Sequence, residues 1–232
     1  MILPLYLAMT AGEFANCKSL PDKVAWMGCH FSSRDLGLSN MPQWLPEGSL
    51  LMVDDWMPIG GHDPHLIGRQ LQETVVKFHC KGIILDFQRP GSEETMALCR
   101  YLSEAIPCPV AVSHWYAEGL DCPVFLSALP LRKRLAEHLS PWLGRPIWME
   151  ATLDAEEAVV TEDGCQILPG CLDPLPAPWH KDESLYCRYH WEKKDQAAQF
   201  LVQRQKEDLT AMLDSATGQD LELAVGLYQQ LK

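Results

Sequence analysis

The chain has 232 residues, of which 47% are hydrophobic, and this is enough to bury a large core in one α/β domain spanning residues 1–232. Its 31 acidic residues outnumber the 19 basic ones, so the formal net charge is −12. Such a charge opposes binding to nucleic acids and to anionic membrane surfaces, because neutralising phosphate groups needs clustered Lys and Arg. We therefore expect neither nucleic acid nor a membrane among the partners.

The apolar start, residues 1–9, lacks a positively charged leader region and is too short to cross a bilayer, so it predicts a first strand rather than a targeting segment. The nine cysteines are scattered and include no CxxC pair. This pattern is typical of free thiols in a reducing, cytoplasmic compartment and gives no structural zinc site. We expect no metal and no cofactor, and the oligomeric state is left open.

Short apolar runs bounded by Pro, Gly or Asp recur along the chain and predict eight strands. They are apolar at nearly every position, as in a parallel sheet that is covered on both faces. The predicted strands are residues 3–9, 23–31, 49–55, 82–87, 109–114, 123–128, 146–151 and 185–190.

Helical patterns separate several of these strands. The clearest is residues 64–78, with apolar side chains at three- and four-residue spacing and Asp63 as N-cap. Further helices are predicted over residues 92–105, 131–139, 195–215 and 221–231. Alternation of strand and helix predicts a (β/α)8, TIM-barrel-like domain.

Two connections depart from this pattern. Residues 32–48 are rich in Gly and Pro and show no helical period, so one or two early helices are expected to be missing. Between strands seven and eight, residues 158–160 and 165–168 flank Thr161-Glu162-Asp163-Gly164, which predicts an inserted β-hairpin. The Pro-rich residues 169–178 are predicted to be a loop and not a domain boundary.

Polar and aromatic side chains gather at the carboxyl ends of the predicted strands, where a parallel barrel places its chemistry. Carboxylates and amides hydrogen-bond sugar hydroxyls, and aromatic faces pack on the apolar face of a pyranose, so the set predicts a site for an oligosaccharide or another small molecule. Its members are Asp54, Asp55, Asp86, Gln88, His114, Trp115, Tyr116, Glu150, Tyr189 and Trp191.

The run from Lys81 to Gln88 resembles the fourth-strand signature D-G-x-D-x-D-x-E of glycoside hydrolase family 18, the chitinase family. Gly82 and Asp86 occupy family positions, and Phe87 stands where an aromatic residue is usual. Lys81, Ile84 and Gln88 replace the first Asp, the middle Asp and the final Glu. The resemblance covers about eight residues and implies a degenerate family 18 barrel.

In that family the final Glu is the catalytic acid, and a carboxamide has no proton to give to the leaving oxygen. The resemblance therefore implies a pseudoenzyme that binds a carbohydrate or glycan-like ligand without ordinary family 18 hydrolysis. In this interpretation Gln88 is a neutral hydrogen-bonding replacement and Asp86 an orienting carboxylate. Asp54, Trp115, Tyr116 and Tyr189 line the ligand pocket.

Two other interpretations stay open. Asp86 and Glu150 lie at the ends of predicted strands four and seven, positions that many barrel glycosidases use for an acid/base and a nucleophile, so the chain could be an active glycosidase or another barrel hydrolase. Alternatively, the barrel is a non-catalytic cytoplasmic scaffold or interaction protein. A mouth filled by Met57, Trp115 or the 169–178 loop would favour the scaffold.

Overall fold

The computed structural model describes residues 3–89 and 91–232. Its centre is a closed barrel of eight parallel strands, in which each strand pairs with the next and β14 pairs with β1. In barrel order the strands are β1 (Leu5–Met9), β2 (Val24–Phe31), β4 (Leu50–Asp54), β5 (Gly82–Asp86), β6 (Val110–Ser113), β7 (Val124–Leu126), β8 (Ile147–Glu150) and β14 (Leu221–Leu227). The predicted (β/α)8 fold is confirmed, and the first seven barrel strands lie within the predicted runs.

The eighth strand was predicted wrongly. Residues 185–190 overlap β12 (Cys187–Lys194), which belongs to a second sheet, and the strand that closes the barrel is β14 in the region predicted to be helical. Of the predicted 221–231 helix, only the last four residues are helical, and they form α6 (Tyr228–Leu231). Leu, Glu and Ala favour a helix locally, but pairing with β1 and β8 buries Leu221, Leu223 and Val225 and decides the outcome.

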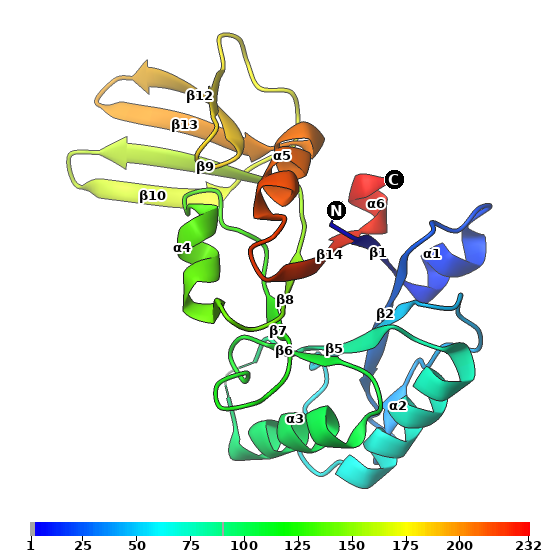
Figure 1. The fold of residues 1–232 in the computed structure, drawn as a ribbon. Coiled ribbons are helices and arrows are strands. Elements are labelled where there is room, and N and C mark those ends of the chain that lie inside the picture. The colour runs from blue at the N-terminus through cyan, green and yellow to red at the C-terminus, as the bar shows by residue number, and fades with distance from the viewer. Residues whose placement is uncertain (1–2, 90) are drawn as a thin grey trace.

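Helices cover the barrel unevenly (Figure 1). They are α1 (Ala11–Asn16), α2 (Pro64–Phe78), α3 (Glu93–Ala105), α4 (Leu135–Leu139) with the 3-10 turn η1 (Ser140–Trp142), and α5 (Lys206–Ala216). Asp63 caps α2 as expected, since its side chain accepts a hydrogen bond from the His65 amide. Residues 32–49 contain no helix, only β3 (Leu38–Ser39), which pairs antiparallel with β2.

The barrel interior is filled by side chains. One buried cluster gathers there, consisting of Tyr6, Ala8, Ala25, Leu50, Met52, Ile84, Ala111, Phe125, Trp148, Leu223 and Val225. The Trp148 ring lies against the backbone of Gly82, where an added Cβ would stand 2.5 Å from Trp148 Cη2 and 2.8 Å from the Pro109 carbonyl oxygen. Because the interior is packed, a ligand has room only at an end of the barrel.

A five-stranded antiparallel sheet is inserted between β8 and β14, in the order β10-β9-β13-β12-β11. It comprises β9 (Asp154–Thr161), β10 (Gly164–Pro169), β11 (His180–Asp182), β12 and β13 (Ala197–Arg204), and it projects to one side of the barrel in Figure 1. The insertion is therefore larger than the expected hairpin. Residues 197–204 form β13 and not the first half of a helix. Of the predicted 195–215 helix only residues 206–215 are helical, and they belong to α5.

Arg204 joins the inserted sheet to the barrel. Its side chain is 1% exposed, and its guanidinium donates to the carbonyls of Leu129, Leu185 and Tyr186. Leu129 belongs to the barrel loop after β7, whereas the other two carbonyls precede β12. One buried cation therefore ties three chain segments together, and burial lowers its pKa because the charged form is desolvated.

Within the described residues, every helix is too short or too polar to cross a membrane.

Candidate functional site

Asp86 and Gln88 lie together at the carboxyl end of β5, the fourth barrel strand. The Gln88 side-chain amide donates a hydrogen bond to Asp86 Oδ1, and Asp54 stands beside Asp86 in the register between β4 and β5. Burial raises the pKa of Asp86, the Gln88 hydrogen bond opposes this rise, and the nearby Asp54 and Asp55 carboxylates add to it. The signature positions therefore form a contiguous polar pair at the barrel mouth.

A small cavity of about 50 Å³ opens between Asp86 and Glu150, and its walls are Ala8, Met27, Met52, Phe125, Val225, Gly226 and Leu227. Glu150 ends β8 and accepts a hydrogen bond of 3.3 Å from the Ala128 amide. Burial raises the pKa of Glu150 above its usual value, and Asp86 raises it further. The cavity has the volume of one or two water molecules, so a sugar ring would lie above it and not inside it.

Asp55 supports the loop and does not line this cavity. It is 4% exposed, and its two carboxylate oxygens accept hydrogen bonds from the amides of Gln88 at 3.0 Å and Arg89 at 2.8 Å. The carboxylate thereby holds the chain where it leaves β5. Asp54 is half-buried, and its Oδ1 accepts a hydrogen bond from the Trp56 amide at 3.0 Å.

The residues after β6 divide between surface and core. Tyr116 is fully buried, and its hydroxyl donates to the Arg89 carbonyl at 2.6 Å, so it supports the β5 loop from within. Trp115 is 61% exposed and packs against the half-buried His114 ring, with the ring centroids 4.3 Å apart and the planes tilted by 36°. Burial lowers the pKa of His114, as does the charge of Lys133.

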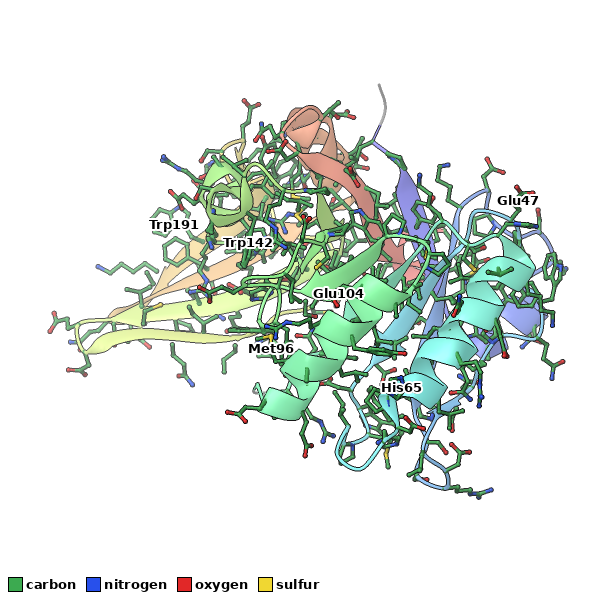
Figure 2. The ribbon with its side chains drawn as sticks, turned by 60° about the horizontal axis from the view of Figure 1, so that its bottom comes forward. Glu47, His65, Met96, Glu104, Trp142 and Trp191 are labelled. Atoms are coloured by element: carbon green, nitrogen blue, oxygen red, sulfur yellow. The ribbon has the colours of Figure 1, made fainter. Side chains whose placement is uncertain are left out.

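Tyr189 and Trp191 do not follow a barrel strand, because β12 belongs to the inserted sheet. The Tyr189 ring packs against His180 at 5.3 Å, and Trp191 stacks on Phe200 at 6.3 Å. Figure 2 shows Trp191 on the inserted sheet, away from α2 and α3. Neither residue lines the cavity that Asp86 and Glu150 share.

One exposed aromatic residue beside this site was missed by the sequence reasoning. Trp56 follows Asp55 directly after β4, is 73% exposed, and meets the His30 ring edge-on at 6.1 Å. The Arg89 guanidinium donates to its carbonyl. The available signal was a tryptophan immediately beyond a strand end, the same signal that singled out Trp115.

Among the described residues, no group of three or more His, Cys, Asp or Glu side chains is arranged to hold a metal ion. The contacts described above define a candidate site of Asp54, Asp86, Gln88 and Glu150, with Trp56 and Trp115 on the loops that follow β4 and β6.

No protein-family model matches the sequence, and no curated protein is significantly similar to it. Several solved structures share the fold. The spore cortex-lytic enzyme SleL of Bacillus cereus superposes with a TM-score of 0.61 at 10% identity, over 99% of this chain and 71% of that chain. A mutant of the GH18 chitinase from Cycas revoluta, in complex with (GlcNAc)4, gives 0.62 at 11% identity, over 96% and 94% of the two chains.

A chitinase from Chromobacterium violaceum gives a TM-score of 0.60 at 8% identity, over 99% of this chain and 95% of that chain. At these identities the likeness concerns the fold. The chain thus has the parallel eight-stranded barrel that is also found in GH18 chitinases and in SleL.

Proposed function

We propose that this chain is a chitinase-like barrel that binds an oligosaccharide over the carboxyl ends of β4, β5 and β8 without acid-catalysed hydrolysis at Gln88. The observation that carries the proposal is the Asp86–Gln88 hydrogen bond at the end of the fourth barrel strand. It puts a carboxamide at the place that the family 18 resemblance reserves for the acid.

The hydrogen bond also sets the chemistry of the carboxamide. Because Nε2 of Gln88 donates to Asp86, its Oε1 is left to accept a hydrogen bond from a ligand hydroxyl or amide. A carboxamide has no ionisable proton, so it cannot protonate a leaving oxygen. Gln88 can therefore recognise a sugar but cannot act as the acid of glycoside hydrolysis.

Exposed tryptophans give such a ligand apolar surfaces to lie against. Trp56 and Trp115 follow β4 and β6, the barrel strands on either side of β5. Aromatic rings of this kind pack against pyranose faces, while Asp86 and Gln88 supply hydrogen bonds. Oligomers of GlcNAc are the first ligands to test, since chitinases with this fold are seen in complex with them.

The proposal is tested by calorimetric titration of the chain with (GlcNAc)4, accompanied by product analysis after long incubation. We expect saturable binding and no cleavage. Asp86→Ala should lose the binding, whereas Asp22→Ala should retain it, because the exposed Asp22 precedes β2 at the opposite end of the barrel. Absence of binding by the folded wild-type chain to GlcNAc oligomers and to a wider glycoside panel would refute the proposal and favour a non-catalytic interaction protein.

A second candidate function rests on Asp86 and Glu150. Both carboxylates line the same cavity, and burial raises the pKa of each, as required of a group that must hold a proton for acid catalysis. This candidate is an active glycosidase. Slow cleavage of a glycoside by the wild type that disappears in Glu150→Gln, with the fold intact, would establish it and overturn the non-hydrolytic proposal.

A further inference from the structure

Strand β10 forms an outer edge of the inserted sheet and, apart from Pro169 at its last position, lacks the residues that usually protect such an edge. It pairs with β9 on one side, and among the described residues no strand pairs with its other side. Its sequence Gly-Cys-Gln-Ile-Leu-Pro contains no charge, and all its side chains except Ile167 are exposed. The opposite edge, β11, is short and consists of His180, Lys181 and Asp182. Natural sheets use such short, charged edges to prevent association.

The register shows which backbone groups of β10 are free. The turn to β9 has two residues, so Thr161 and Gly164 close it as a hydrogen-bonded pair, and the direction of the backbone groups alternates from there. The N–H and C=O groups of Gly164, Gln166 and Leu168 therefore point to β9. Those of Cys165 and Ile167 point outward.

We propose that β10 is the association edge for a second copy of this chain. The two β10 strands pair antiparallel about a two-fold axis at Gln166, so that each inserted sheet of five strands continues into its partner. In this register residues 164–168 of one copy face residues 168–164 of the other. Cys165 then lies opposite Ile167 of the second copy, and the outward backbone groups of both residues are satisfied.

A second copy fits this edge because the register is self-complementary. Gln166 faces itself across the axis, and two carboxamides can each donate to and accept from the other. Pro169, which has no N–H, falls just outside the paired segment. Because β10 has no charged side chain, two copies of the strand can pair without charge repulsion between them, although the chain as a whole carries a net charge of −12.

The apolar face of the sheet favours the same arrangement. The register places Ile167, Ala158, Phe200 and Trp191 in one row across four strands, on the face that also carries Cys165 and Val160. Trp191 is 49% and Val160 is 39% exposed. Pairing through β10 would place Ile167, at the outer end of this row, beside Cys165 of the second copy on the same face and shield both side chains from water.

The test is the oligomeric state of the full chain, measured by sedimentation velocity over a concentration series up to about 100 µM. We expect a dimer. Gln166→Lys and Gln166→Glu each place like charges opposite one another and should each weaken the dimer by up to about fivefold. An equimolar mixture of the two variants should recover a dimer through a Lys–Glu pair.

Gln196→Lys is the matched control, because the same change at the exposed β12–β13 turn leaves the β10 edge untouched and should keep the dimer. Circular dichroism checks that each variant is folded. A wild-type chain that stays monomeric at the highest concentration would overturn the proposal. A dimer that both Gln166 variants retain, or a failure of their mixture to associate, would do the same.

Discussion

Replacing Arg204 by Met tests whether this buried cation holds the inserted sheet on the barrel. The substitution keeps an extended side chain but removes the donors to the carbonyls of Leu129, Leu185 and Tyr186. A buried acceptor left without its donor costs about 1–3 kcal/mol, so three acceptors set an upper range of about 3–9 kcal/mol. Part of this cost is recovered, because desolvation lowers the pKa of Arg204 and the charge is itself unfavourable there. We expect a net loss of about 3–5 kcal/mol in the free energy of unfolding.

Urea unfolding followed by tryptophan fluorescence gives this difference, and hydrogen exchange locates it. Amide protection should fall first in β12 and β13, next to the carbonyls that lose their donors. Arg100→Met, on the exposed side of α3, is the control and should change stability by no more than about 0.5 kcal/mol. If Arg204→Met loses less than about 1 kcal/mol, the three contacts do not stabilise the joint and the reasoning is wrong.

Three further predictions concern the barrel. Gln88→Glu should confer cleavage of (GlcNAc)4, because it restores an ionisable proton beside Asp86, and product analysis would detect the cleavage. A variant that cleaves nothing would show that the glutamine at position 88 does not by itself account for the inactivity. Glu150→Gln should raise the thermal midpoint at neutral pH but not at a pH below 4.5, the ordinary pKa of a glutamate. The reason is that a carboxyl group whose pKa is raised in the folded state contributes stability at low pH, and this contribution is lost as the pH rises through the raised pKa. An equal change of the midpoint at both pH values would contradict the prediction. Gly82→Ala should cost about 1–3 kcal/mol in chemical unfolding through its clash with Trp148 and Pro109, and an unchanged midpoint would show that the ring moves aside at little cost.

Local sequence patterns were sufficient for the strands that are buried on both faces. The runs that became β1, β2 and β4 to β8 are apolar nearly throughout and bounded by turn residues, so their burial and their local preference agree. For β14 the two disagree. Leu-Glu-Leu-Ala favours a helix locally, and only contacts with β1 and β8, far away in the sequence, make it a strand.

The same difference explains which site residues could be found. Asp54, Asp86 and Glu150 end barrel strands, so their positions follow from the strand prediction alone. Tyr189 and Trp191 were placed by a strand that belongs to the other sheet. Tyr116 was placed after the correct strand, but whether a side chain turns outward or into the core depends on the Arg89 carbonyl that its hydroxyl contacts.

The contact between Gly82 and Trp148 bears on the resemblance of residues 81–88 to the chitinase signature. Gly82 is the glycine of that signature, yet it lies at the start of β5, whereas Asp86 and Gln88 lie at and just beyond its end. Because Gly82 has no Cβ, the indole ring of Trp148 can pack against its backbone in the barrel interior. A short sequence motif can thus combine two independent requirements. One is the packing of the barrel interior, and the other is contact with a ligand at the barrel mouth. This chain meets the first requirement in full, so its likeness to the signature would persist at Gly82 even if the barrel bound no sugar at all.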